Sequence, residues 1–163
     1  MKEVPKHHLS LIFREDLSLS TNGINCLSST SSSLISGSRD GVVREYNTLD
    51  RSLTNLYAGH IHWINSIACS DFFLFSASSD SRIQAWRYEI TQPVHTLTHH
   101  KDTVHCLKFQ ENFLYSGGED NILYRTDLDY KNEELFTFNS SIWHFDYLEN
   151  LAVVTLASKV IYI

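Results

Sequence analysis

Histidine, serine and aspartate recur in this sequence in combinations that could perform chemistry. Each of two segments contains one residue of each type, and the two segments are 40 residues apart. An imidazole that is held by a carboxylate can activate a neighbouring hydroxyl as a nucleophile. One hypothesis is therefore a small hydrolase, which turnover by the purified chain would reveal. The two sets are His60, Ser76 and Asp80, and His100, Ser116 and Asp120.

The nine histidines also raise the question of a metal site. Some are close in sequence, such as His99 and His100, and imidazole is a common zinc ligand. The 40-residue spacing gives His60 and His100 a structural explanation instead. His7, His8 and His99 look like exposed polar positions. We therefore expect no metal and no cofactor.

The three cysteines point to unmodified thiols. Cys26 and Cys106 are 80 residues apart, so they occupy the same position two repeats apart, too far from each other for a disulfide. Cys69 has no partner at this spacing, and the histidine and acid that would activate a thiol are not evident. Buried, reduced thiols are typical of proteins in the cytoplasm or nucleus, which is the localisation we expect.

A repeat with a period of 40 residues organises the chain. Leu34–Asp40, Leu74–Asp80 and Leu114–Asp120 share a small-residue segment that runs into aspartate. A period near 40 with this pattern is typical of propeller blades. The intervening segments are short and rich in β-branched or aromatic residues, and none has a convincing helical pattern. The sequence therefore predicts an all-β fold.

The register predicts one domain of about three complete blades and a partial fourth. The fourth repeat lacks the turn aspartate and the outer strand. An N-terminal strand over residues 8–13, His8–Phe13, could complete the last blade. The expected ranges within the single domain of residues 1–163 are about 23–58 for blade 1, 63–98 for blade 2, 103–138 for blade 3 and 142–163 for the partial blade 4.

Blade 2 carries a set of residues that resembles a known family. Gly59-His60, Ser76, Asp80 and Trp86 follow one another in order. This series resembles the WD-repeat (WD40) propeller family, in which a loop histidine, a strand serine, a turn aspartate and a strand tryptophan form a hydrogen-bonded chain across the blade. The resemblance implies that these polar residues are structural and that the chain is not an enzyme.

The other two complete repeats keep part of this set. Blade 3 has threonine in place of the tryptophan. Blade 1 lacks the histidine and has a tyrosine as a substitute for the tryptophan. By resemblance, the structural residues are His100, Ser116 and Asp120 in blade 3, where Thr126 stands at the tryptophan position, and Ser36, Asp40 and Tyr46 in blade 1.

We expect these blades to form an open arc. Propellers contain about four to eight blades, but the blades of the resembled family are shaped for a wide ring, and four of them would need a much sharper wedge angle. Two explanations compete: a shortened arc, or a reduced propeller that pairs with a second copy or a partner. Unpaired edge strands invite pairing, so self-association through the open blade edges is expected.

Composition narrows the classes of partner. The net charge is −6, with 19 acidic against 13 basic residues, whereas nucleic-acid-binding surfaces are normally basic. The longest apolar runs, such as Phe72–Phe75 and Leu151–Leu156, are far shorter than a membrane-spanning helix. The segment Met1–His8 lacks the apolar core of a signal peptide. We therefore expect protein partners, no direct nucleic-acid contact and no membrane span.

One column of the repeat suggests where a partner could bind. Gly23, Trp63, Thr103 and Trp143 share the position just before each inner strand. Tryptophan is enriched at the energetic centres of protein interfaces. Trp63, Thr103 and Trp143 are therefore candidate partner-binding residues, and the alternative is that each tryptophan covers the edge of its blade.

A narrower resemblance suggests a function. Leu9–Asp16, Asn22–Leu27 and Ser36–Asp40 are similar to the start of the WD-repeat activators of ubiquitin-specific proteases (UAF-one type), and Leu114–Leu128 is similar to a late blade. The intermediate blades and the C-terminal ubiquitin-like extension of that family are missing. The resemblance implies a non-catalytic scaffold that binds and activates such a protease. The alternative is a WD-repeat adaptor in another complex, for example in ubiquitin ligation, trafficking or RNA processing.

Overall fold

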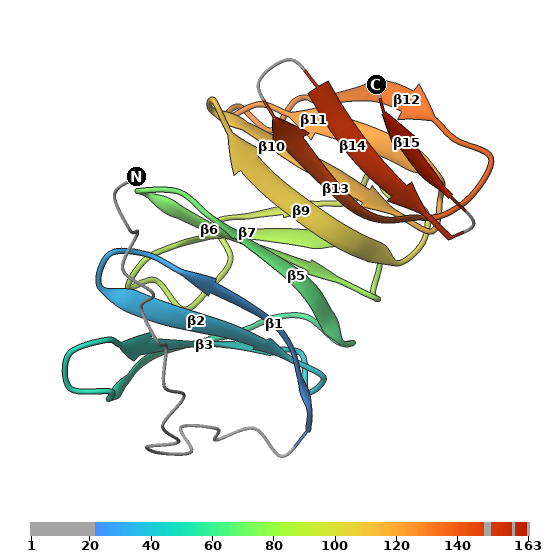
Figure 1. Cartoon of the computed structure of the whole chain (residues 1–163). Coiled ribbons are helices and arrows are strands. Elements are labelled where there is room, and N and C mark those ends of the chain that lie inside the picture. Colours follow the sequence, from blue (N-terminus) through green and yellow to red (C-terminus); the bar gives the residue numbers. More distant parts are fainter. Residues whose placement is uncertain (1–21, 149–150, 158, 163) are drawn as a thin grey trace, which may run out of the picture.

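The computed structural model describes residues 22–148, 151–157 and 159–162. Within these residues the chain forms fifteen strands and no helix. The expected N-terminal strand over residues 8–13 lies outside the described residues. The strands form four separate sheets that we call blades 1 to 4, and within each sheet consecutive strands are antiparallel neighbours (Figure 1).

The first three blades have four strands each, and blade 4 has three. Blade 1 comprises β1 (Ile24–Ser29), β2 (Ser33–Ser38), β3 (Val42–Asn47) and β4 (Leu53–Ala58), and blade 2 comprises β5 (Ile64–Cys69), β6 (Phe73–Ser78), β7 (Ile83–Arg87) and β8 (His95–Leu97). Blade 3 comprises β9 (Val104–Gln110), β10 (Phe113–Gly118), β11 (Ile122–Thr126) and β12 (Asn132–Thr137), and blade 4 comprises β13 (Ile142–Leu148), β14 (Leu151–Leu156) and β15 (Val160–Tyr162).

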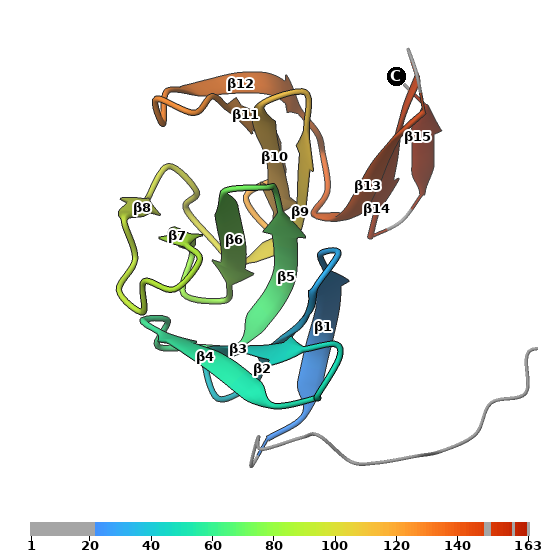
Figure 2. The ribbon, with the colours of Figure 1, turned by 90° about the vertical axis from the view of Figure 1, so that its left-hand side faces the viewer.

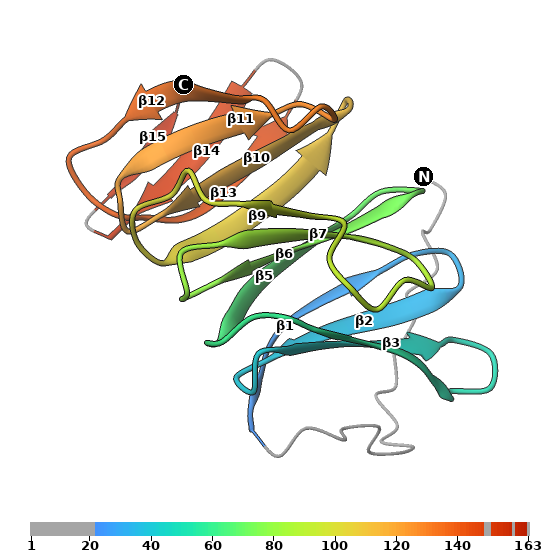
Figure 3. The same cartoon turned by 180° about the vertical axis from the view of Figure 1, so that it is seen from behind.

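The blades form an open arc around their inner strands. β1, β5, β9 and β13 lie nearest the centre, and the described chain places no sheet between blade 4 and blade 1 (Figure 2). Seen from behind, the blades follow one another in chain order (Figure 3). The predicted fold class, an all-β open arc of three complete blades and a partial fourth, is confirmed.

The turn between the second and third strands is closed by its aspartate. The Val42 N–H donates to Asp40 Oδ1 at 3.0 Å, and the same contact recurs at Asp80 and Asp120 at 3.0 and 3.2 Å. Gly41, between donor and acceptor, has a φ of 77°, which glycine adopts without strain. Aspartate is favoured here because its side chain satisfies a backbone donor of the turn.

Neighbouring blades pack where an aliphatic side chain is seated on a small residue. A Cβ added at Gly37 would lie 2.6 Å from Ile64 Cγ2, and one at Gly117 would lie 2.8 Å from Ile142 Cγ2. Ala77 holds the equivalent position in blade 2. We call this position the seat. It is small because the inner strand of the next blade approaches it closely.

The inner strand of blade 1 has the aliphatic side chains of such a junction, but no described blade packs against them. Ile64 and Ile67 of β5 are 0% and 8% exposed where they pack against blade 1. Their equivalents in β1, Ile24 and Leu27, are 43% and 62% exposed. One end of the arc is therefore apolar.

Blade 4 differs from the others at the seat. His144 pairs with Thr155, as Cys26 pairs with Gly37 in blade 1. The Thr155 hydroxyl donates to the His144 carbonyl oxygen at 3.1 Å. A branched, hydrogen-bonded side chain thus occupies the position that glycine or alanine holds in the other three blades.

The seat makes a prediction about stability. Gly37→Ala should lower the free energy of unfolding by about 1–3 kcal/mol, because a methyl group overpacks the junction against Ile64. Gly23→Ala is the control, since the nearest atoms there are the flexible end of Arg39 at 3.6 Å or more. Denaturant unfolding measures both, and equal stability of the two variants would contradict the seat.

Candidate functional site

Four side chains of blade 2 form one chain of hydrogen bonds. His60, in the loop before β5, has Nδ1 2.9 Å from Asp80 Oδ2 and Nε2 2.9 Å from Ser76 Oγ. Trp86 Nε1 donates to the same Ser76 Oγ at 2.9 Å. With the Nδ1 proton donated to Asp80, Nε2 accepts from the serine hydroxyl, so each group has a partner. The structure brings all four residues together.

This series of hydrogen bonds has the Asp–His–Ser order of a catalytic triad, but its groups are buried. Ser76 is fully buried, and the side chains of His60 and Asp80 are 0% and 2% exposed. A nucleophile must reach the reacting atom of a substrate, and this hydroxyl is already held by Trp86. The arrangement fastens the strands of the blade to one another.

The electrostatics of Asp80 fit this structural role. Burial acts to raise the pKa of the Asp80 carboxyl, but the hydrogen bond and charge of His60 and the N–H groups of Ile61 and Arg82 outweigh it. Those N–H groups donate at 3.1 and 3.0 Å. The pKa of Asp80 therefore lies below its ordinary value, and the carboxylate is stabilised in the fold.

Blade 3 forms the same series of hydrogen bonds without the tryptophan. His100 Nδ1 lies 2.7 Å from Asp120 Oδ2, and its Nε2 lies 2.8 Å from Ser116 Oγ. Thr126, at the tryptophan position, donates instead to Asn132 Oδ1 at 2.9 Å. Burial acts to raise the pKa of Asp120, but the hydrogen bond and charge of His100 help to lower it overall.

Blade 1 does not form the expected chain. Arg44 Nη1 and Nη2 donate to the two carboxylate oxygens of Asp40 at 3.1 and 2.8 Å. Ser36 Oγ and Tyr46 OH are buried and have no hydrogen-bond partner among the described residues. The physical reason is that the frame has Ser20, outside the described residues, in place of a histidine, and Arg44 reaches the turn aspartate instead.

His99 is not the exposed polar residue that was expected. Both of its ring nitrogens are buried and have no hydrogen-bond partner among the described residues. Its ring lies 4.5 Å from that of Tyr124 and 4.8 Å from that of His100. Burial, and then the neighbouring His100, lower the pKa of His99 from 6.5 to about 4. At neutral pH the neutral ring packs as an aromatic group.

The two candidate tryptophans lie half-exposed at junctions between blades. Trp63 is 50% exposed, and the Arg39 guanidinium of blade 1 lies 4.8 Å from its ring centre. Trp143 is 54% exposed and stacks on His105 of blade 3, with 4.4 Å between ring centres and 9° between planes. Each tryptophan thus covers a junction and still presents one face. We call this pair the tryptophan rim.

The residues that support this rim were not predicted from the sequence. Arg39 Nε donates to Asn25 Oδ1 at 3.0 Å, and His105 Nε2 lies 3.0 Å from Glu119 Oε1. Arg39 and Glu119 are 80 residues apart, as are Asn25 and His105, so the 40-residue frame could have paired them. Thr103, the third candidate, contributes its carbonyl oxygen, which accepts the Glu119 N–H at 2.8 Å.

Other chemical sites have little support in the described residues. Among them, no group of three or more His, Cys, Asp or Glu could hold a metal ion. Cys26, Cys69 and Cys106 are free thiols. Burial raises the pKa of Cys26 and of Cys106 to about 12, so both are protonated at neutral pH. No helix that could cross a membrane occurs in the described part of the chain.

The core position of Trp86 predicts a large stability effect. Its ring is fully buried and lies 5.6 Å from that of Tyr57, between blades 1 and 2. Trp86→Ala should lower the free energy of unfolding by about 3–5 kcal/mol, because it leaves a cavity and removes the donor to Ser76. Trp143→Ala, at a half-exposed tryptophan, is the control and should cost less. Urea unfolding of both variants checks this, and a Trp86→Ala protein as stable as wild type would contradict it.

Protonation predicts how stability depends on pH. The pKa of His99 is lower in the fold than its ordinary value of 6.5, so its protonation favours the unfolded chain. Stability should therefore fall as the pH drops from about 6.5 to about 4. The lowered pKa values of Asp80 and Asp120 add a second loss below their ordinary value of 3.8.

Urea midpoints between pH 7.5 and pH 3 measure both stages. His99→Phe should flatten the first stage and leave the second, because phenylalanine retains the ring packing but does not titrate. A first stage of unchanged size in that variant would contradict the assignment to His99.

Comparisons with known proteins agree with this geometry. Residues 14–47 and 91–124 match the WD40 family, described as "WD domain, G-beta repeat". The chain is 35% identical over 99 residues to the ribosome biogenesis protein WDR12 homolog of Nematostella vectensis, a match that covers 55% of this chain and 24% of that protein. It is 32% identical over 93 residues to apoptotic protease-activating factor 1 of Rattus norvegicus, covering 55% of this chain and 7% of that protein. The chain thus spans a small part of these relatives.

Solved structures share the fold. The computationally designed Ika4 protein superimposes with a TM-score of 0.80 at 20% identity, over 93% of this chain and 98% of Ika4. The WD40 β-propeller domain of Doa1 gives a TM-score of 0.78 at 24% identity, over 88% of this chain and 52% of that chain. Two segments of the chain match the model of the WD40 repeat, and its four antiparallel sheets have the fold of propeller blades.

Proposed function

We propose that this chain is a non-catalytic scaffold that binds other proteins through the tryptophan rim. The observation that supports the proposal is that Trp63 and Trp143 each present an exposed face while Arg39 and His105 hold the other. Aromatic groups that are held in place bind at low entropic cost, and tryptophan is enriched among residues that dominate interface energies. The histidine, serine, aspartate and tryptophan side chains of blade 2 are occupied by internal hydrogen bonds.

The comparisons favour the general adaptor over the protease activator. The relatives are named for ribosome biogenesis and for activation of an apoptotic protease, and neither name concerns ubiquitin-specific proteases. Activation of such a protease therefore rests on the sequence motifs alone. A location in the cytoplasm or nucleus, the absence of direct nucleic-acid contact, and self-association through the open blade edges stay predictions.

The rim predicts a separation of binding from folding. Trp63→Ala should weaken the binding of a captured and purified partner about 30-fold, because a central tryptophan contributes ~2 kcal/mol or more to the binding free energy of an interface. Its melting temperature should change little, since half of the ring is exposed. Calorimetric titration with the partner and thermal unfolding measure the two effects.

Phe72→Ala is the matched control. Phe72 is an aromatic residue that is 71% exposed and lies in the turn between β5 and β6, at the end of blade 2 away from Trp63. It should bind the partner as wild type does. A Trp63→Ala protein that binds as tightly as wild type, or that unfolds like Trp86→Ala, would exclude the rim as the binding surface.

A further inference from the structure

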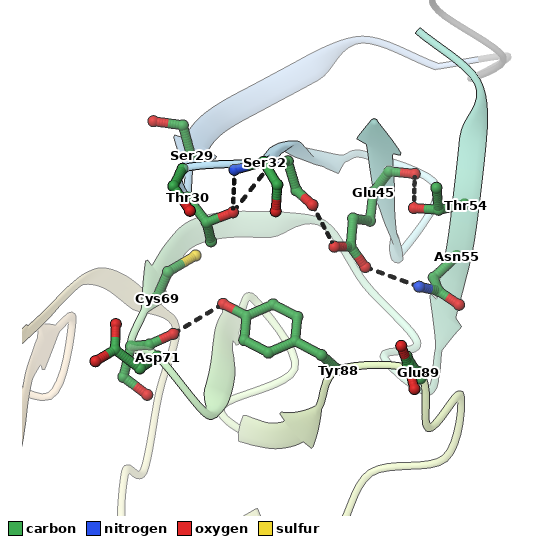
Figure 4. Close-up of a pocket in the computed structure, with 13 residues that line it drawn as sticks. Ser29, Thr30, Ser32, Glu45, Thr54, Asn55, Cys69, Asp71, Tyr88 and Glu89 are labelled. Atoms are coloured by element: carbon green, nitrogen blue, oxygen red, sulfur yellow. Dashed lines mark hydrogen bonds between the residues drawn. The ribbon is translucent and has the colours of Figure 1, made fainter. Parts of the chain in front are cut away.

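A cavity lies between blades 1 and 2 at the end opposite the tryptophan rim. It is bounded by the turn between β1 and β2, the turn between β5 and β6, and the residues that follow β7 (Figure 4). Its volume is about 570 Å³, within the range of about 300–1,000 Å³ that is usual for ligand sites. None of the residues assigned to the blade chains or to the rim lines it.

A buried carboxylate forms part of the wall. Glu45 of β3 is only 6% exposed and lines the cavity (Figure 4). Its Oε1 accepts from Ser33 Oγ at 2.6 Å, and its Oε2 accepts from Asn55 Nδ2 at 2.9 Å and from Tyr57 OH at 2.7 Å. All three donors are neutral. The described residues thus solvate the carboxylate without supplying a counter-charge.

The rest of the wall adds acceptors and negative charge. Seven of the thirteen lining residues are serine or threonine, and three are acidic: Glu45, Asp71 and Glu89. None is lysine, arginine or histidine, so nothing in the wall offsets the charge of the acids. A ligand that is complementary to this surface carries positive charge and several hydrogen-bond donors.

An aromatic ring restricts the shape of that ligand. Tyr88 lines the cavity on the side of blade 2, and its hydroxyl is fixed by donation to the Ser70 carbonyl oxygen at 3.0 Å. In Figure 4 the Tyr88 ring and the Glu45 carboxylate lie around the same space. A planar cation can stack on such a ring while it donates to a carboxylate and to hydroxyls.

We propose that this cavity binds the guanidinium group of an arginine in a partner protein. Guanidinium combines planarity, five N–H donors and weak hydration, which suits a hydroxyl-rich wall with a carboxylate that has no cationic partner. The ammonium group of lysine is strongly hydrated and does not stack, so it fits less well. Among the described residues no group of three or more potential ligands is arranged for a metal ion, so a bare cation is the poorer occupant. This site is independent of the tryptophan rim.

The test uses a short peptide, Ac-Gly-Arg-Gly-NH₂, and its citrulline counterpart, which has the same shape without the charge. Amide shifts of the full chain, titrated at low salt, should give at least tenfold tighter binding of the arginine peptide. The shifts should concentrate around Ser33 and Tyr88. Equal binding of the two peptides, or no shift at millimolar peptide, would overturn the proposal.

Variants assign the binding to the cavity. Glu45→Gln keeps the size and the acceptor oxygen and should weaken the arginine peptide at least tenfold. The double variant Asp71→Asn/Glu89→Gln changes exposed positions only, so it keeps the proposal testable if Glu45→Gln does not fold, and it should weaken binding about threefold. Asp102→Asn, at an exposed acid outside the cavity, is the control and should bind as wild type does.

Two outcomes distinguish this site from the rim. Trp63→Ala should bind the arginine peptide with unchanged affinity, so a rim that fails its own test leaves the cavity unaffected. Wild-type affinity in both Glu45→Gln and the double variant would show that the peptide binds elsewhere, and would overturn the proposal.

Discussion

The arc depends on the seating of one inner-strand side chain on a small residue of the preceding blade. Ile64 on Gly37 and Ile142 on Gly117 approach so closely that a Cβ would collide. This approach brings the inner strands of adjacent sheets into close contact. The tryptophan rim crosses the same two junctions, because Trp63 meets Arg39 of blade 1 and Trp143 meets a residue of blade 3. The seat therefore sets the position of the exposed aromatic faces as well as the packing.

The interior of each blade and its two ends have different tasks. The buried chain around His60 and Ser76 is complete, since each donor has an acceptor, and it leaves no group free for catalysis. The exposed aromatic groups and the acidic cavity lie instead at the ends of the blades. One end presents apolar, aromatic faces, and the other encloses an acidic cavity around Glu45. Two partners, or two parts of one partner, could be held at once.

The sequence predicted the fold class because a 40-residue period repeats the strands and turns together. The same period identified the blade 2 set, since each of its members lies at a fixed place in the frame. It did not anticipate Arg44, whose long side chain takes over a histidine's contact with Asp40. Nor did it anticipate that the ring nitrogens of His99 are buried, with the Tyr124 ring packed against the imidazole. The cavity also escaped prediction, because the 40-residue frame aligns its two turns, Ser29–Ser31 and Cys69–Asp71, but does not show that Glu45 and Tyr88 border the same space.

Because blade 4 has a threonine at the seat, the two ends of the arc are not complementary to each other. Blade 1 ends in the exposed pair Ile24 and Leu27, which needs a glycine or alanine opposite, whereas blade 4 ends in Thr155. Two identical arcs that met end to end would place this threonine against Ile24 and Leu27, so their contact would not copy the internal junctions. A sheet that packs against blade 1 in the same way must have a small residue at its seat, opposite Ile24 and Leu27. This end of the arc therefore selects its neighbour by steric fit.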